Sequence, residues 1–230
     1  LINKILNTHS NIKFLGVSIN SKTLKKDNLF IAIKGKRNDG HYYLKEAFSK
    51  GASGCVVSKN NFQISSKKNV RVDNTFKFLN KLAVLKRNYL NAKIIAVTGS
   101  SGKTSVKDLI GNLLNVFGKT YFSPKSYNNQ YGVPLSLCNL ENTHKYGVFE
   151  IGMNKTGEIG KLSKLVKPDL GIITNVAEAH IENFKNLDQI AEAKSEIIDN
   201  ISQTGSLIID RDSKFFDFFK SKAEKKKKLI

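Results

Sequence analysis

Long apolar runs are missing from the sequence. No stretch of about 18 consecutive apolar residues occurs, and no signal-peptide pattern is visible. Cysteine is also scarce, because the chain has only Cys55 and Cys138, which lie far apart among apolar neighbours. Such cysteines are typical of reduced core residues in a reducing compartment. We therefore expect a cytoplasmic protein without membrane insertion.

Arginine is rare, although the formal net charge is +19. Four of the 38 basic residues are arginines, and the lysines are spread along the whole chain. Nucleic-acid surfaces more often use clustered arginine with interleaved aromatic side chains. We therefore interpret the charge as lysine-rich solvated surface and expect no nucleic-acid partner. The run Lys225–Lys228 is typical of a solvated tail or a helix end, and the pattern predicts no helix or strand at the C-terminus.

The most informative motif is KIIAVTGSSGKT, at positions 93–104. An apolar strand pattern leads directly into a glycine-rich turn, and a helical pattern follows it. Gly99 and Gly102 allow a sharp turn and a close approach of the main chain to phosphate oxygens. Lys103 could reach terminal phosphates, and the Thr104 hydroxyl could bind Mg²⁺. The predicted ATP-binding residues of this loop are Thr98, Gly99, Ser100, Ser101, Gly102, Lys103 and Thr104.

One position departs from the general phosphate-binding motif. Val97 stands where that motif has its first glycine, so the sequence carries the shorter form G-x-x-G-K-T. A loop that binds no nucleotide is therefore the alternative. The apolar strand before the loop and the helical pattern after it favour a nucleotide loop.

The predicted helices and strands fall into two blocks. In the first, we expect strands at 29–33, 55–57 and 70–72, a helix at 42–50, and a second helix that begins after Asn74. In the second, strands at 94–98, 119–122, 148–151, 170–174 and 206–209 alternate with helices at 103–117, 133–140, 158–166 and 188–200. Such alternation predicts a parallel sheet with helices on both faces. We predict an α/β protein with a small N-terminal domain, residues 1–90, and a central parallel-sheet domain, residues 91–230.

Polar residues follow the predicted strands of the second block, at the edge where parallel sheets bind ligands. Glu150 follows one strand, and a segment with Asn175 and His180 follows another. A carboxylate beside a triphosphate loop is a natural Mg²⁺ partner, because this ion prefers oxygen ligands. Taken alone, Glu150 also fits a helix cap or a surface carboxylate, and His180 fits an ordinary loop histidine.

Several longer strings occur in order along the chain. They are LFIAIKGKRNDGHYYLKEAFSKGA (29–52), TGSSGKT (98–104), NNQYGVPLSL (128–137), FEIGMNKTGEIGKLSKLVKPDLGIITNVAEAHIENF (149–184) and AEAKSEII (191–198). Together they resemble the Mur ligase family. The resemblance implies a uridine-nucleotide-binding N-terminal domain and a central ATPase-like domain of the P-loop type. It also implies an ATP-dependent peptide ligase of peptidoglycan precursor synthesis that uses Mg²⁺.

The resemblance also assigns roles to individual residues. Family members convert a carboxylate into an acyl phosphate, which an amine then attacks to give an amide. By similarity, Thr104 and Glu150 hold one Mg²⁺, His180 belongs to a second metal site, and Asn128 and Asn129 lie near the phosphates or the substrate. The implied catalytic residues are Lys103, Glu150, His180 and Lys194. The strings E-x-G-x-N (150–154) and A-E-A-H (177–180) favour the member that joins D-alanyl-D-alanine to UDP-N-acetylmuramoyl-tripeptide.

Lys194 lies in an A-K-x-E segment whose lysine is carbamylated in the family and then serves as a metal ligand. Only a neutral amine reacts with carbon dioxide, and with an ordinary pKa near 10.4 about one lysine in a thousand is neutral at pH 7. The resemblance therefore implies that burial or a nearby cation lowers the pKa of Lys194. The alternative is a surface lysine paired with Glu192 or Glu196.

The resemblance implies that the first block binds the UDP-sugar. The candidate residues are Ser21, Lys34, Asn38, Asp39, Gly40 and His41. Asp39-Gly40 also fits a simple tight turn. Asn20-Ser21-Lys22 stands where relatives usually carry Asp-Ser-Arg, and lysine cannot reproduce a bidentate arginine contact.

Other functions fit parts of the pattern. The related ligase that adds the third residue is the nearest alternative, and a non-catalytic nucleotide-binding or nucleic-acid-binding module is another. Family members continue with the rest of the central domain and a C-terminal ligase domain, which we expect to be absent here. We therefore expect the chain to fold at least partly without completing the ligation. The sequence does not determine the oligomeric state, and a monomer is our expectation.

Overall fold

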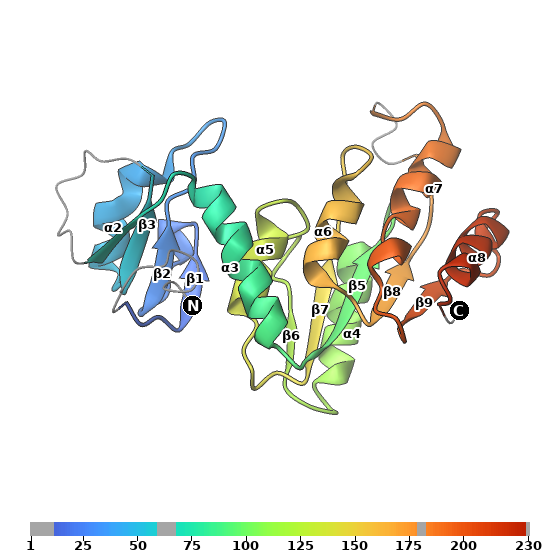
Figure 1. Cartoon of the computed structure of the whole chain (residues 1–230), viewed down its shortest axis with the longest axis horizontal. Coiled ribbons are helices and arrows are strands. Elements are labelled where there is room, and N and C mark those ends of the chain that lie inside the picture. The colour runs from blue at the N-terminus through green and yellow to red at the C-terminus, as the bar shows by residue number, and fades with distance from the viewer. Residues whose placement is uncertain (1–11, 59–67, 179–182, 229–230) are drawn as a thin grey trace. The chain divides into compact units, whose positions relative to one another are not determined.

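The computed structural model describes residues 12–58, 68–178 and 183–228. The chain divides into two units, residues 1–88 with 137–139 and residues 89–136 with 140–230. Each unit contains its own parallel sheet (Figure 1), so the predicted α/β fold class is confirmed. None of the helices in the described ranges is long and apolar enough to cross a membrane.

The sheet of the first unit has four strands in sequential order. They are β1 (Gly16–Ser18), β2 (Asn28–Ile31), β3 (Gly54–Val57) and β4 (Asn69–Arg71), and every neighbouring pair is parallel. The helical elements are the 3₁₀ helices η1 (Ser21–Thr23) and η2 (Gly40–Tyr43) and the α-helices α2 (Leu44–Ser49) and α3 (Thr75–Tyr89). Strands β2 and β3 are buried almost throughout. Continuous apolar strands of this kind are typical of a parallel sheet.

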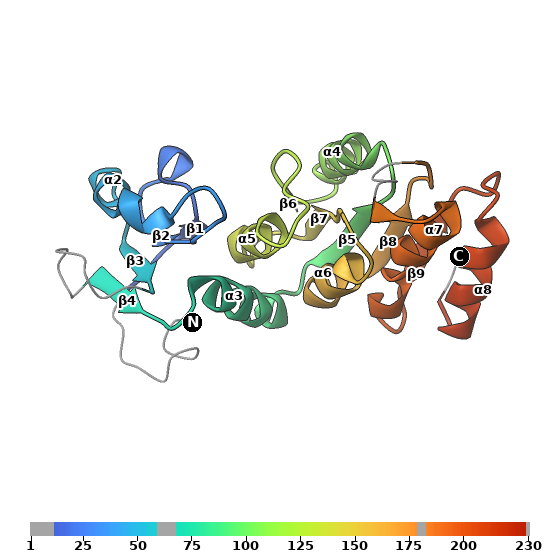
Figure 2. The same cartoon turned by 90° about the horizontal axis from the view of Figure 1, so that it is seen from above.

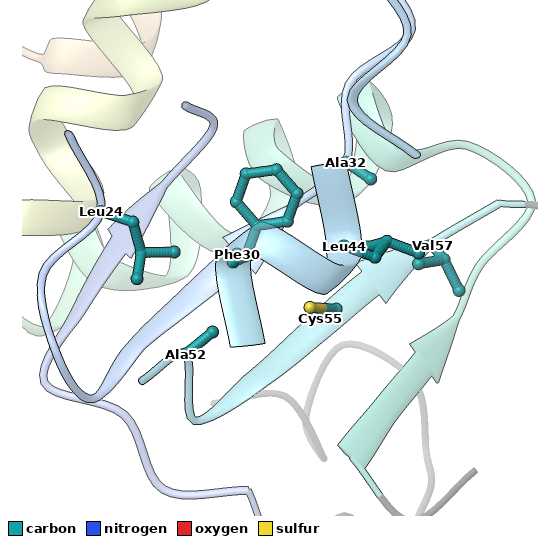
Figure 3. Close-up of a cluster of buried hydrophobic side chains, with 8 residues drawn as sticks. Leu24, Phe30, Ala32, Leu44, Ala52, Cys55 and Val57 are labelled. Carbon is teal, nitrogen blue, oxygen red and sulfur yellow. The ribbon is translucent and has the colours of Figure 1, made fainter. Parts of the chain in front are cut away.

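The first unit has a compact apolar core between the sheet and α2 (Figure 3). Its buried members are Leu24, Phe30, Ala32, Leu44, Ala47, Ala52, Cys55 and Val57. Helix α3 begins where the sequence predicts, because the Asn74 side chain accepts a hydrogen bond of 2.8 Å from the Lys77 main-chain N–H. Both cysteines are buried and free, as expected from their apolar neighbours.

The sheet of the second unit has five parallel strands in the order β6-β7-β5-β8-β9. They are β5 (Lys93–Thr98), β6 (Thr120–Phe122), β7 (Tyr146–Glu150), β8 (Leu170–Ile173) and β9 (Ser206–Ile209). Strand β5 is central, with Val97 opposite Glu150 of β7 and Thr98 opposite Ile173 of β8. The carboxyl ends of these three strands therefore meet at one edge, where the strand order reverses and doubly wound folds bind ligands.

The helices of the central sheet lie on both of its faces. They are α4 (Lys103–Leu114), α5 (Gly132–Asn139), α6 (Glu158–Val166), α7 (Leu187–Ser195) and α8 (Phe216–Lys225). Figure 2 shows α4 on one face and α6 on the other. Helix α4 packs Val106, Ile110 and Leu114 onto the strand core that includes Val97 and Ile172. This face fixes the helix that follows the glycine-rich turn.

Several predicted boundaries and one predicted absence are wrong. Helix α8 occupies the C-terminal region where no helix was expected, and it buries Phe219 and Ala223, four residues apart. Strand β1 was also not predicted. Helix α4 ends at Leu114 rather than at residue 117, and α7 ends at Ser195, before a separate 3₁₀ turn η5 (Ile198–Asn200).

Candidate active site

The glycine-rich segment Gly99–Thr104, called the phosphate loop below, joins β5 to α4. Gly99 and Gly102 have φ angles of +147° and +75°, which other residues rarely adopt. A Cβ atom at Gly99 would lie 1.9 Å from Thr174 Oγ1, so only glycine fits there. Gly102 is the N-cap of α4. The first N–H groups of an α-helix have no acceptor within the helix, so the start of α4 directly after this loop is suited to bind an anion.

The segment after β8 holds the first half of the phosphate loop. The Asn175 side-chain oxygen accepts hydrogen bonds from the main-chain N–H groups of Ser100 (3.2 Å) and Ser101 (3.0 Å). Its side-chain N–H donates to Ser101 Oγ at 2.8 Å. The Ser100 hydroxyl contacts both the N–H and the carbonyl of Ala177 at 2.9 Å. These contacts fix the loop independently of any ligand, and Asn175 is the side chain responsible for most of them.

Lys103 folds back over the loop that precedes it. Its Nζ donates to the carbonyls of Gly99 (2.8 Å) and Ser100 (3.1 Å). Burial lowers the pKa of Lys103 from its ordinary value, and the negative charge of Glu150 opposes this shift. The ammonium group of the first residue of α4 thus lies against the phosphate loop, and a cation there favours a negatively charged ligand.

Glu150 connects three segments at the carboxyl edge of the sheet. Its side chain is 1% exposed. One carboxylate oxygen accepts a hydrogen bond of 2.7 Å from the Thr104 hydroxyl, and the other accepts one of 2.7 Å from the Asn128 amide. The Glu150 main-chain N–H donates to Ser123 Oγ at 3.3 Å. The structure therefore brings together Thr104, Asn128 and Glu150, and the reading of Glu150 as a surface carboxylate is wrong.

The oxygen atoms in this network suit a magnesium ion. A carboxylate beside a threonine hydroxyl offers the hard oxygen ligands that Mg²⁺ prefers, and the ion usually keeps several waters besides them. Within residues 12–58, 68–178 and 183–228, no group of three His, Cys, Asp or Glu side chains forms a cluster that could hold a metal. The predicted ligand His180 lies outside the described residues.

Asn129 differs from its neighbour Asn128. Its side-chain oxygen accepts hydrogen bonds of 3.0 Å from the main-chain N–H groups of Tyr131 and Gly132, at the start of α5. The Asn129 side chain thus stabilises a local turn, whereas Asn128 contacts Glu150. Of this predicted pair, the structure brings only Asn128 into the network around Glu150.

Lys194 of α7 is buried, with 2% of its surface exposed. Burial and the nearby charge of Lys103 lower the pKa of Lys194 to about 7. The two carboxylates that could pair with a surface lysine have other partners. Glu192 forms an ion pair of 2.6 Å with Lys222, and Glu196 accepts hydrogen bonds from the N–H groups at the start of α6. The alternative interpretation of Lys194 as a paired surface lysine is therefore wrong.

Two of the predicted substrate residues in the first unit are buried. The Ser21 hydroxyl donates to Glu46 at 2.8 Å, and the Glu46 carboxylate also pairs with Lys50. His41 is 1% exposed, and its Nδ1 lies 2.5 Å from Asp39 Oδ1. Its Nε2 accepts a hydrogen bond of 2.9 Å from the Ser58 N–H, so the proton lies on Nδ1. His41 and Asp39 thus contribute directly to the folding of their own loop.

The other candidates of the first unit lie on an exposed turn. Lys34 forms an isolated antiparallel bridge with Asp39, and the carbonyl of Asn38 accepts a hydrogen bond of 2.8 Å from Gly35. The side chains of Lys34 and Asn38 are exposed. Asp39 is the N-cap of η2 and its carbonyl accepts a hydrogen bond from Tyr42, so Asp39-Gly40 begins the turn of a 3₁₀ helix next to the turn at residues 35–38. The exposed side chains of Lys34 and Asn38 remain candidates for ligand contact.

Sequence reasoning missed three residues that build the edge of the central sheet. Asn175 was noted as polar but given no role, and Ser123 and Lys107 were not noted. Ser123 follows β6 directly, so the rule that polar residues after parallel strands lie near the site could have found it. Lys107 carried no such signal, since a lysine on a predicted amphipathic helix is normally assigned to solvent.

Comparison with protein-family models gives two matches. The model of the Mur ligase middle domain matches residues 97–230, and that of the Mur ligase family catalytic domain matches residues 13–87. The first match alone covers more than half of the chain. The chain belongs to the Mur ligase family. Both matches agree with the resemblance expected from the phosphate loop and the strings that follow it.

Individual Mur ligases show the same relationship. The UDP-N-acetylmuramoyl-tripeptide–D-alanyl-D-alanine ligase of Rickettsia prowazekii is 43% identical over 195 residues, which are 84% of this chain and 43% of that protein. The ligase of the same name from Escherichia coli is 34% identical over 86% of this chain and 43% of its own length. The chain thus spans about half the length of the curated relatives it matches.

Solved Mur ligase structures match nearly the full length of this chain. The crystal structure of MurF from Acinetobacter baumannii matches 97% of this chain and 51% of its own, with a TM-score of 0.84 and 29% identity. The MurF ligase of Thermotoga maritima, solved in complex with ADP, matches 94% of this chain and 50% of its own, with a TM-score of 0.77 and 30% identity.

Proposed function

We propose that the chain belongs to an ATP-dependent amide ligase that joins D-alanyl-D-alanine to UDP-N-acetylmuramoyl-tripeptide in the cytoplasm. Relatives that match it over both units carry this activity in their names. The observation that carries the proposal is the 2.7 Å hydrogen bond between Thr104 and Glu150. It joins the hydroxyl of the phosphate loop to a buried carboxylate, which is the arrangement that a Mg²⁺-bound nucleotide needs.

The proposed reaction transfers the γ-phosphoryl group of ATP to the carboxylate of the UDP-sugar peptide, with ADP as the leaving group. The amine of D-alanyl-D-alanine then attacks the acyl phosphate, and the tetrahedral intermediate releases phosphate and a proton to give the amide. Negative charge develops in both steps. The N–H groups of Gly102–Thr104 and the Lys103 ammonium would stabilise that charge, and one such donor typically lowers the barrier by about 3 kcal/mol.

The metal would be held through Thr104 and Glu150, with Asn128 fixing the orientation of the carboxylate. When bound, Mg²⁺ supplies positive charge to the phosphate oxygens. Because the Thr104 hydroxyl already donates its proton to Glu150, its lone pairs can face the ion.

We further propose that Lys194 is carbamylated and that His180 contributes to a second metal site. The neutral amine attacks carbon dioxide, a C–N bond forms, and the amine releases a proton. Supporting this step, the pKa of Lys194 is lowered to about 7, so a large share of the amine is neutral near pH 7. Incubation with ¹³C-bicarbonate should give a carbamate carbon signal that is missing in a Lys194→Met variant.

The UDP-sugar would bind the first unit through the exposed side chains of Lys34 and Asn38, beside the turn at Asp39-Gly40. Ser21 and His41 would act by shaping this surface, because their side chains are buried. The lysine at position 22 provides one point charge where an arginine would give a planar pair of donors.

The decisive experiment is calorimetric titration with three ligands. We expect the chain to bind ATP with Mg²⁺, and to bind UDP-N-acetylmuramoyl-tripeptide more tightly than the corresponding dipeptide. Tighter binding of the dipeptide would favour the related ligase that adds the third residue. Binding of ATP without either UDP-sugar would leave only a nucleotide-binding module, and binding of neither ligand class would reject the proposal.

A further inference from the structure

Lys107 is a buried cation with a complete set of partners. Its side chain is fully buried, at 0% exposure, in the middle of α4. The ammonium donates to the carbonyl oxygens of Ser123 (2.6 Å) and Lys125 (2.8 Å) and forms an ion pair of 2.9 Å with Asp108. An ammonium group has three N–H donors, so each donor has one acceptor. Burial of such a charge is costly, which makes a plain packing role a poor explanation.

The two carbonyls belong to the loop between β6 and α5, residues 123–131, called the β6–α5 loop below. Lys125 within it has a φ angle of +48°, in the left-handed region that costs about 1–2 kcal/mol for a residue with a side chain. Such a conformation persists where the surroundings hold it. The hydrogen bond from Lys107 to the Lys125 carbonyl is a contact of this kind.

The β6–α5 loop reaches the candidate active site at three points. Asn128 donates to Glu150 at 2.7 Å, and Ser123 Oγ accepts from the Glu150 N–H at 3.3 Å. Ser126 Oγ lies 3.5 Å from Thr104 Oγ1. Ser126 and Asn128, which follow the Lys107 contacts in the chain, therefore touch the hydroxyl and the carboxylate that we propose as metal ligands.

Lys107 also stands three residues after Thr104 on the same helix, so both side chains lie on one face of α4. Thr104 contacts Glu150 directly, and Lys107 fixes the loop that brings Asn128 to the other oxygen of Glu150. Helix α4 thus orients both oxygens of the carboxylate, one through a hydroxyl and one through a buried ammonium.

We infer that Lys107 is a positioning residue of the metal–nucleotide site. It holds the β6–α5 loop so that Asn128 and Ser126 meet Glu150 and Thr104 in the geometry that a Mg²⁺-bound nucleotide requires. The inference rests on the proposed function, because it assumes that Mg²⁺ and a nucleotide occupy this edge of the sheet. It adds a residue that touches neither of them.

The test compares nucleotide binding with and without Mg²⁺. Lys107→Met keeps an unbranched side chain, one heavy atom shorter than lysine, and removes all three donors. ADP affinity is measured by calorimetry in excess Mg²⁺ and in EDTA. We expect a loss of about tenfold in Mg²⁺ and of less than about threefold in EDTA, because the phosphate loop itself is intact. A general loss of stability would lower both affinities by the same factor.

The matched control is Lys228→Met. Lys228 also donates to a main-chain carbonyl, that of the partly buried Ser202 at 2.7 Å, but it lies outside the candidate active site. We expect this variant to bind ADP as the wild type does under both conditions.

A double variant tests the route from Lys107 to Glu150. Lys107→Met combined with Asn128→Ala should lose no more Mg²⁺-dependent ADP affinity than Asn128→Ala alone, because both changes remove the same contact to Glu150.

Three results would overturn the inference. The first is wild-type affinity of Lys107→Met in Mg²⁺, and the second is an equal loss in Mg²⁺ and EDTA. The third is a failure of the wild type itself to bind ADP. This third result rejects the proposed function and the inference together, whereas the first two reject the inference alone.

If Lys107→Met does not fold, Lys107→Gln replaces it, because the amide keeps two N–H donors. For Lys107→Gln we expect ADP affinity to fall about threefold in Mg²⁺ and to stay unchanged in EDTA.

Discussion

The phosphate loop of the second unit and the turn at Lys34–His41 of the first unit use their residues differently. Both follow a buried strand of a parallel sheet. In the phosphate loop, main-chain N–H groups and Lys103 gather on one side, next to the buried carboxylate Glu150. In the turn, Asp39 and His41 point into the protein, and Lys34 remains exposed.

The difference shows which kind of site a sequence motif describes well. A phosphate site is made largely of main-chain groups, and glycine spacing specifies the main-chain path directly. A sugar-nucleotide site depends on side chains, some of which the fold needs for its own hydrogen bonds. Substitutions in each of the two regions test this difference.

Gly99→Ala should have the largest effect. The new Cβ would lie 1.9 Å from Thr174 Oγ1 at a φ of +147°, so the phosphate loop or the segment after β8 must move. We expect the free energy of unfolding to fall by about 3 kcal/mol or more, from overpacking and backbone strain together. At Gly102 a Cβ atom meets open space, so Gly102→Ala should cost only about 1–2 kcal/mol. Urea denaturation measures both, and equal losses would show that the close approach at Gly99 is unimportant.

Lys103→Met should abolish most of the nucleotide affinity. Loss of charge-assisted hydrogen bonds to phosphate should lower ATP affinity about a hundredfold, or about 3 kcal/mol. Lys34→Met serves as the control in the other region, and it should leave ATP affinity unchanged while lowering UDP-sugar affinity about fivefold. Calorimetric titration with each ligand measures these effects. A change in ATP affinity from Lys34→Met would contradict the division of roles between the two regions.

His41→Ala should destabilise the first unit rather than remove a ligand contact alone. Both ring nitrogens have partners, and their loss leaves the Ser58 N–H and the Asp39 carboxylate without one of theirs. We expect a loss of about 2 kcal/mol in the free energy of unfolding. Asn38→Ala, on the exposed turn, should change stability by less than about 0.5 kcal/mol. If His41→Ala unfolds at the wild-type urea concentration but no longer binds the UDP-sugar, His41 contacts the ligand directly.

The sequence predicted the phosphate loop, the strand that leads into it and the position of Glu150, because each depends on local spacing or on parallel register. It did not predict the burial of Lys107, whose two main-chain carbonyl acceptors lie 16 and 18 residues further along the chain. Helix α8 was missed for a different reason. Its apolar positions, Phe219 and Ala223, are few, and the lysines around them are typical of a solvated tail.

Lys194 gives a prediction about the dependence of stability on pH. It is a buried amine at the functional edge of the second unit, whereas Lys34 in the turn of the first unit is exposed. The pKa of Lys194 is about 7 in the folded protein and near 10.5 when unfolded. Between these values the unfolded chain binds one more proton than the folded chain, so the free energy of unfolding rises with pH. The contribution is about 1.4 kcal/mol per pH unit.

Lys194→Met removes this contribution. In buffer freed of carbon dioxide, the wild type should gain about 1.4 kcal/mol per unit relative to Lys194→Met as the pH rises from about 7 to about 9. Urea denaturation at each pH measures the difference. The exposed Lys164 of α6 supplies the control, because Lys164→Met should follow the wild-type slope. Parallel plots of the free energy of unfolding against pH for the wild type and Lys194→Met would mean that the folded protein keeps the amine protonated. The neutral amine that carbamylation needs would then have to arise only after a ligand binds.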